Sequence, residues 1–376
     1  MKNILIGNGI NIQFDNKNYT TKSIVLRLLK NCDKDDFPRH IIVDYPYLMK
    51  NYLGKLFLEA RAIIKGDYDL YAFGTVEKQS LIAFKERYAS RLLTLKMTDI
   101  GFEDYYLVHD LVCHKTNTQN PDQWTIREAM KIAYLYAIYN DGKLEELYKN
   151  YSGKLIKELS SYDQIFTTNY DTNIEKATGK NVLHIHGSFS QKSDVYVASS
   201  FRNQLPDAPV RDIKIDEKYY YLYSNAISTY AGAYKEFQLK EASQANACVE
   251  KMASVYEEDE KIRQEIDRWC RCDNKLTRNL GYAIKLKANY PNLSFKDNYH
   301  FDKLKSINGE LAILGLSPWN DYHIFESINA ANIEKCIFWF YSEGDCLAVE
   351  KLLPTLKANG ILFFRDAKDF WSKMNA

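Results

Sequence analysis

The sequence predicts an α/β fold in which a parallel sheet is flanked by helices and interrupted by two helical insertions. Short apolar runs that end in glycine or polar side chains are typical of buried parallel strands, and they recur at residues 2–6, 164–167, 181–186 and 311–316. From residue 310 onward such runs alternate with amphipathic segments of about ten residues, as expected for strands joined by crossover helices.

The spacing of these runs divides the chain. Residues 1–44, 160–205 and 308–376 are predicted to build one Rossmann-like domain, and residues 45–159 and 206–307 to be helical insertions. One domain interrupted twice explains this pattern better than three independent units.

The composition limits the class of protein. The chain has 376 residues, 46% of them hydrophobic, which is enough for a proper core. Lys and Arg number 50 against 49 Asp and Glu, so net charge does not indicate nucleic acid or an anionic membrane as a partner. Seven scattered cysteines and no apolar run of about 18 residues favour a cytoplasmic protein without a membrane span.

The N-terminal strand, residues 2–6, ends in Gly7, Asn8 and Gly9, and a helix is expected after Thr20 or Thr21. A glycine turn between strand and helix lets the backbone approach a diphosphate. Ile12 stands where the dinucleotide fingerprint has its third glycine, so a purely structural turn is the competing interpretation.

The middle of the chain carries the residues best suited to chemistry. Residues 164–167 lead into Thr168, Asn169 and Asp171, and residues 181–186 end in His186 and Gly187. A short helix with a capping box of Thr172 and Glu175, ending at Gly179, is expected to join these two strands. Parallel strands end at one edge, so these polar side chains are predicted to face one cleft.

Several residues have two interpretations. Asp171 is either catalytic or an aid to the helix start, and Asn169 either functional or a turn residue. His184 and His186 share a strand face and suit a metal, but no third ligand lies nearby in sequence, so no metal is predicted and His184 is assigned structural support. His323 on the late helix is expected to be ordinary surface or packing, with recruitment by a phosphate at the helix N-terminus as the alternative.

The remaining predictions concern the secondary structure of the two insertions and of the C-terminal part. Residues 45–159 have helical periodicity and are expected to cover the sheet as a cap, with tyrosines that either pack between helices or line a cleft. Residues 188–210 are expected to be a loop and 219–305 helical, with Cys270 and Cys272 as free thiols. After the strand at 311–316 come a helix capped by Asn320 or Asp321, a strand at 336–341, a helix at 346–358, a strand at 361–364 and a last helix.

Four motifs in order resemble a known family. GNGIN (7–11), TTNYD (167–171), HIHG (184–187) and GLS (315–317), followed by Asn320 and Asp321, are similar to the motifs of sirtuins. The residues of these motifs most closely resemble those of prokaryotic sirtuin-like proteins of anti-phage defence systems. The N-terminal Gly-Asn-Gly motif followed by Tyr19 is also similar to the AbiH abortive-infection family. The motifs cover about a tenth of the chain.

The resemblance implies that the chain binds NAD as a substrate. Gly7, Asn8 and Gly9 would approach the diphosphate, Asn169 would hold the ribose and the attacking water, Asp171 would orient this loop, and His186 would be the general base. Gly315 and Ser317 would contact the adenosine side. The remaining motif residues assigned to NAD binding on the same basis are Asn11, Thr168, Gly187 and Asn320.

The departures from deacylating sirtuins favour hydrolysis. Two C-x-x-C pairs of their zinc ribbon are absent from the sequence, and insertions occupy the region where an acyl-lysine peptide would enter. The expected activity is cleavage of NAD to nicotinamide and ADP-ribose by an effector of abortive infection that is activated by assembly, as a homo-oligomer or with an ATPase- or helicase-type partner. The alternatives are a sensor that binds NAD or ADP-ribose, and a nuclease or ADP-ribosyltransferase working with such a partner.

Overall fold

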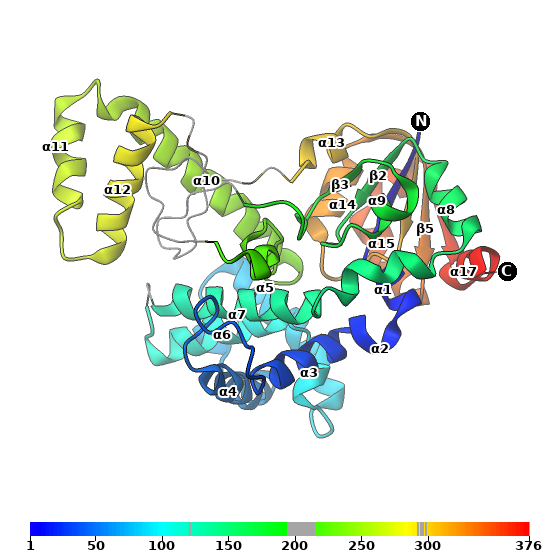
Figure 1. The fold of residues 1–376 in the computed structure, drawn as a ribbon, viewed down its shortest axis with the longest axis horizontal. Helices are drawn as coiled ribbons and strands as arrows, with labels where there is room; N and C mark the ends of the chain where they lie inside the picture. The colour runs from blue at the N-terminus through cyan, green and yellow to red at the C-terminus, as the bar shows by residue number, and fades with distance from the viewer. Residues whose placement is uncertain (120–121, 194–214, 292, 294–296, 298, 376) are drawn as a thin grey trace.

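The computed structural model describes residues 1–119, 122–193, 215–291, 293, 297 and 299–375 (Figure 1). Its centre is a six-stranded, all-parallel sheet with the strand order β3-β2-β1-β4-β5-β6, which confirms the predicted α/β fold and its Rossmann-like sheet. The strands are β1 (Lys2–Ile6), β2 (Gln164–Thr167), β3 (Val182–His184), β4 (Asn308–Leu314), β5 (Asn332–Phe340) and β6 (Leu362–Asp366).

Each face of the sheet is covered by its own set of helices, because alternate side chains of a strand point to opposite faces. Leu5 of β1 and Ile313 of β4 pair in register and pack under one layer, whereas Ile4 and Ile6 pack under the other. The first layer consists of α13 (Phe301–Lys305), α14 (Tyr322–Asn329), α15 (Glu343–Leu352) and α16 (Pro354–Ala358), and the second of α1 (Gly9–Phe14), α8 (Gly153–Ser160), α9 (Asn173–Thr178) and α17 (Ala367–Asn375).

Two elements differ from the sequence-based expectation. The single helix predicted at 346–358 is two helices, α15 and α16, with a break at Leu353. Pro354 starts α16, and the residue before a proline is driven out of the helical region; Leu353 accordingly has φ −119° and ψ 56°. The strand predicted at 181–186 ends at His184, which leaves His186 in the loop beyond the sheet edge.

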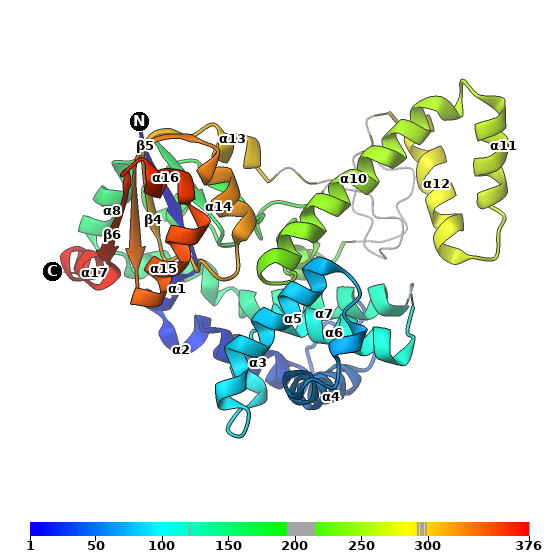
Figure 2. The same cartoon turned by 180° about the vertical axis from the view of Figure 1, so that it is seen from behind.

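The two insertions share one hydrophobic core with residues 19–42, which were predicted to belong to the Rossmann-like domain but pack in the cap. Buried residues from 19–147 and from 189–230 form a single cluster beside the sheet domain, so segments far apart in sequence build the same cap (Figures 1 and 2). Tyr105, Tyr106, Tyr134 and Tyr136 are fully buried in it, which supports helix packing as the role of these tyrosines. The cap contains α2 (Asn16–Tyr19), α3 (Thr21–Asn31), α4 (Pro46–Lys65), η1 (Asp69–Tyr71), α5 (Thr75–Tyr88), η2 (Ala89–Arg91), η3 (Met97–Asp99), α6 (Asp104–Thr116), α7 (Asp122–Tyr139), η4 (Lys143–Asn150) and η5 (Glu217–Tyr223).

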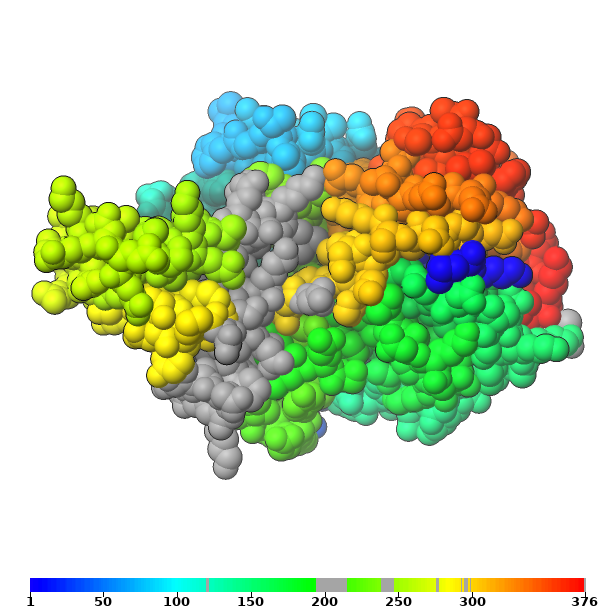
Figure 3. All heavy atoms as spheres, turned by 90° about the horizontal axis from the view of Figure 1, so that it is seen from above, coloured from blue at the N-terminus to red at the C-terminus, as the bar shows by residue number. Residues whose placement is uncertain are grey.

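A helical arm extends from the body (Figures 1 and 2), and the view from above shows it as a projection at one end of the molecule (Figure 3). α10 (Gly232–Tyr256) contacts α5 and α14 near its start and then packs with α11 (Glu260–Trp269) and α12 (Lys275–Asn289). Cys270 and Cys272 are free thiols in this arm. Most of the loop expected at 188–210 lies outside the described residues.

Candidate active site

The strand ends border a cavity of about 700 Å³, which is the size range of small-molecule sites. Its wall contains the loops that follow β1, β2, β3 and β4, and the cap closes the opposite side with residues 101–104, Ile138 and Leu144. The order of the strands reverses between β1 and β4, and sheets of this class bind ligands in the crevice outside such a point. The topology therefore marks this cavity as the candidate site.

The structure brings most of the predicted site residues together. Asn169 and His186, from the ends of neighbouring strands, line the same cavity. The other predicted residues that line it are Asn8, Gly9, Asn11, Thr168, Asp171, Gly315, Ser317 and Asn320. Gly7 and Gly187 are outside the lining; at Gly187, with φ +77°, an added Cβ would lie 2.2 Å from the carbonyl oxygen of Asn225.

The glycines after β1 allow two loops to approach each other. The Gly7 and Gly9 N–H groups donate to the carbonyl oxygens of Leu314 and Gly315, both at 2.9 Å. An added Cβ on Gly7 would lie 2.4 Å from the oxygen of Gly315. These two N–H groups are already used, which supports the structural role weighed against phosphate binding. Asn8 and Asn11 also line this wall, and their side-chain amides are hydrogen-bonded to Tyr19 and Asp171.

His184 holds the Asn169 loop in place, as predicted for a supporting residue. Its Nδ1 donates to the carbonyl oxygen of Asn169 at 2.8 Å, and its Nε2 lies 2.6 Å from Glu175 Oε1. Burial alone would lower the pKa of His184, but the hydrogen bond and charge of Glu175 raise it above the ordinary value. Both partners accept, which favours the doubly protonated ring and fixes the strand end on which Asn169 sits.

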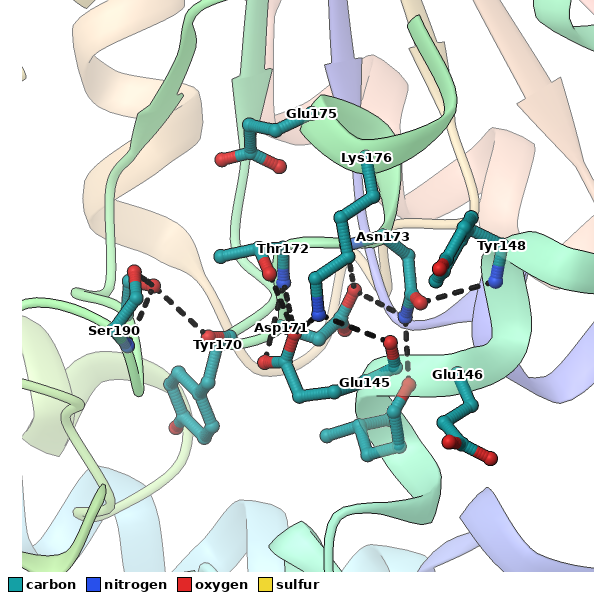
Figure 4. A network of polar contacts seen from close by, with 12 residues as sticks. Glu145, Glu146, Tyr148, Tyr170, Asp171, Thr172, Asn173, Glu175, Lys176 and Ser190 are labelled. Carbon is teal, nitrogen blue, oxygen red and sulfur yellow. Dashed lines mark hydrogen bonds and ion pairs between the residues drawn. The ribbon is translucent and has the colours of Figure 1, made fainter. Parts of the chain in front are cut away.

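Asp171 is the centre of a polar network that fixes the start of α9 (Figure 4). Its carboxylate accepts from Asn11 Nδ2 at 2.8 Å and from the Asn173 side chain and backbone N–H at 2.7 and 3.2 Å. Burial and then Glu145 raise the pKa of Asp171 to about 6, against the effect of these hydrogen bonds. The carboxylate thus acts as a positioning group, which is one of its two expected roles.

The predicted capping box of α9 is wrong. Thr172 precedes the helix, but its hydroxyl donates to Glu145 of the cap (Figure 4). Glu175 is paired with His184 instead. Glu145 also receives the Lys176 ammonium. Partners contributed by η4 and β3 therefore replace the local pairing that the sequence pattern suggested.

His186 belongs to a buried cluster that the sequence did not reveal. Its Nε2 lies 3.0 Å from Nε2 of His323 and 3.8 Å from Oδ1 of Asp321, both near the start of α14. Lys235 of α10 donates to the same Asp321 oxygen at 3.0 Å and to Glu103 of the cap at 2.9 Å. All of these side chains except that of Glu103 are less than a tenth exposed. His323 is thus buried and packs against Phe301, which contradicts the surface interpretation and agrees with the packing one, and it is also a direct partner of His186.

The cluster sets the charge state of its members. Burial and then Lys235 lower the pKa of His186 to about 4, so its ring is neutral at physiological pH. Burial would raise the pKa of Asp321, but Lys235 and the histidines hold it below the ordinary value. Burial and Asp321 raise the pKa of Glu103 to about 7, opposed by Lys235. Asp321 therefore stays ionised at physiological pH, whereas Glu103 gains a proton near neutral pH, so the cluster has a net negative charge only while Glu103 is ionised.

Three groups of this cluster have the chemistry of metal ligands. One donor atom each of His186, Asp321 and His323 lies within 4.8 Å of the others. The fold thus supplies from α14 the further ligands that the sequence near His186 did not offer. Lys235 already neutralises the Asp321 carboxylate, and an ion beside its ammonium would be repelled by about 4 kcal/mol per unit of charge at 4 Å. These side chains are therefore better suited to bind and transfer a proton than to hold a metal ion.

The residues that sequence reasoning missed are Glu103, Lys235 and His323. Glu103 and Lys235 lie in the two insertions, at positions without any motif, and only the fold brings them to the site. Asp321 and His323 come a few residues after the GLS motif at 315–317. Their position next to that motif is the sequence signal that could have indicated them, because both are titratable.

In the part of the chain that the structure describes, no helix is long and apolar enough to cross a bilayer. Comparison of the chain with models of known families, with curated protein sequences and with solved structures finds no match.

Proposed function

We propose that the chain is an NAD⁺ glycohydrolase, which converts NAD⁺ and water into nicotinamide, ADP-ribose and a proton. The observation that carries the proposal is that Asn169 and His186, an amide and a neutral imidazole from adjacent strand ends, line one cavity at the switch point of the sheet. The motifs that surround them resemble those of sirtuin-like proteins, and a cavity of about 700 Å³ suits a ligand of dinucleotide class.

The residue types fit this reaction. When the bond between the ribose carbon and the nicotinamide nitrogen breaks, neutral nicotinamide leaves with the bonding electrons and an oxocarbenium-like ribose remains. Asn169 would hold the ribose and the incoming water, and His186 would accept the proton that the water loses. The Asp321 carboxylate, which Lys235 keeps ionised, would stabilise the developing positive charge.

The test is product analysis on the purified full-length chain. Incubation with NAD⁺ is expected to release nicotinamide and ADP-ribose, measured by chromatography, and Asn169→Ala or His186→Ala is expected to abolish the release. Matched controls are the exposed Asn51→Ala on α4 and His40→Ala, whose side chain is 60% exposed. NAD⁺ binding without products would replace the proposal by a sensor, and loss of DNA insensitive to both active-site substitutions would replace it by a nuclease.

The proposal includes control by assembly. An enzyme that depletes NAD⁺ needs restraint, and the cap that closes the cavity is the part of the chain suited to respond to a partner or a second copy. Nicotinamide release is expected to rise when the chain forms oligomers or meets an ATPase- or helicase-type partner, as measured by light scattering alongside the assay. Full turnover by a monodisperse monomer would refute this control.

A further inference from the structure

His186 and His323 face each other through the same ring atom. The two Nε2 atoms are 3.0 Å apart, a hydrogen-bond distance, and the rings lie at an interplanar angle of 27° with centroids 5.2 Å apart. Both side chains are buried, and they come from segments far apart in sequence, the loop after β3 and the helix α14. The fold has therefore paired two titratable rings directly at the wall of the cavity.

A pair of neutral imidazoles in this geometry holds one proton between the two Nε2 atoms. If neither ring carries that proton, two lone pairs face each other, and if both do, two N–H groups collide. A proton on His186 Nε2 leaves Nδ1 of His186 as the basic nitrogen, whereas a proton on His323 Nε2 leaves His186 with a protonated Nδ1 and no free base. The partner ring thus decides whether His186 can accept a proton from water.

We propose that His323 is the positioning residue of His186: it accepts the Nε2–H of His186 and so keeps Nδ1 basic. This inference rests on the proposed function. His323 takes the place that an aspartate has in a Ser–His–Asp triad, where the partner fixes the tautomer and the orientation of the ring. Among the described residues, the hydrogen bond and the ion pair of the His186 ring both use Nε2, and His186 lines the cavity, so Nδ1 is the ring nitrogen that we assign to the substrate water.

The surroundings suit this direction of the hydrogen bond. The charged and titratable groups around the pair are Asp321, Lys235, Glu103 and Tyr170. When Nδ1 takes the proton of the attacking water, the imidazolium keeps its Nε2–H on His323, and Asp321 Oδ1 at 3.8 Å stabilises the new charge. In this scheme His323 acts only as an acceptor, so no second proton transfer is needed.

The kinetic test compares His323→Phe with His323→Gln in NAD⁺ hydrolysis by the full-length chain. Phenylalanine fills the space without an acceptor, so kcat is expected to fall by about 10²–10⁴-fold, as when a triad aspartate is replaced, with little change in KM. Glutamine retains an oxygen acceptor and is expected to recover at least tenfold. Ser327→Ala on the same helix is the matched control, because its hydroxyl donates to the His323 carbonyl without reaching His186. A kcat for His323→Phe within threefold of wild type would overturn the proposal.

A second measurement does not depend on turnover. The ¹⁵N resonances of the His186 ring at pH 7.5, assigned by comparison with His186→Ala, report which nitrogen carries the proton. We expect a protonated Nε2 and an unprotonated Nδ1, and a mixture of tautomers in His323→Phe. A wild-type His186 protonated at Nδ1 would overturn the proposal. If the chain releases no nicotinamide but shows the expected tautomer, the proposed reaction fails and the pairing stands.

Discussion

Replacing Asp171 by asparagine should remove a defined part of the dependence of stability on pH. The pKa of this buried carboxyl is about 6 in the folded protein, against about 3.9 in an unfolded chain. The folded state therefore binds the proton more tightly, so this group stabilises the fold as pH falls from above 6 towards 4. Over the full range the difference is about 3 kcal/mol, and between pH 8 and pH 5 linkage gives about 1.4 kcal/mol.

Urea-induced unfolding at pH 8 and pH 5 measures this contribution. The change in unfolding free energy between the two pH values should be about 1.4 kcal/mol more favourable to the fold at pH 5 in wild type than in Asp171→Asn. His186 has a lowered pKa and contributes in the opposite direction, but it is present in both proteins and cancels in the comparison. Equal changes in the two proteins would refute the raised pKa and the burial argument behind it.

The same variant separates the two roles of Asp171. Asparagine keeps an oxygen that accepts from the Asn173 side chain and backbone N–H, and the Asn11 amide can turn to meet the new donor. As a positioning group, Asp171 tolerates this change, and nicotinamide release is expected to stay within about tenfold of wild type. A loss as complete as that of His186→Ala would show that the carboxylate itself takes part in the reaction.

The remaining predictions concern the strand-end loops, the charge cluster and the reaction. Gly7→Ala places a Cβ against the Gly315 oxygen and should cost about 1–3 kcal/mol in urea unfolding, whereas Gly54→Ala, with nothing within 4 Å, should gain about 0.5–1 kcal/mol; equal effects would contradict the close approach. Lys235→Met leaves two buried carboxylates without their cation and should cost about 3–5 kcal/mol at pH 8, part of which Glu103→Gln restores; an unchanged unfolding midpoint would contradict the cluster. Because the pKa of His186 is about 4, kcat for NAD⁺ hydrolysis should remain level from pH 7.5 to about pH 5, and a decline centred near 6.5 would indicate an ordinary imidazole.

The sheet could be predicted from the sequence because each strand has a recognisable pattern of its own, a short apolar run followed by glycine or polar residues. Residues such as Leu5, Phe166 and Ile313 lie in short apolar runs, and the polar residues directly after them end at one edge whatever covers the faces. This is why Asn169 and His186 were placed at the same site from the pattern alone. The resemblance of the motifs added the reaction, which stays a prediction.

The cluster around His186 was not readable because its members meet only in three dimensions. Lys235 and Glu103 lie in separate insertions, and neither has a neighbour in sequence that indicates a site. The capping box failed for the same reason: Thr172 and Glu175 had the right spacing, but Glu145 and His184 are stronger partners supplied by distant elements. Sequence patterns such as the capping box predict hydrogen bonds between residues close in sequence. They do not show whether a residue distant in sequence will be the stronger partner.

The central strand also has a consequence for how the protein is made. β1 lies between β2 and β4, so the first strand to leave the ribosome lacks one neighbour until residue 314 has been synthesised, about 15–60 s later at about 5–20 residues per second. Among the described residues, the fully buried part of the cap core ends at Tyr230, so this core can form earlier in translation. A nascent chain can therefore fold the core of its cap before the sheet edge that borders the cavity is complete.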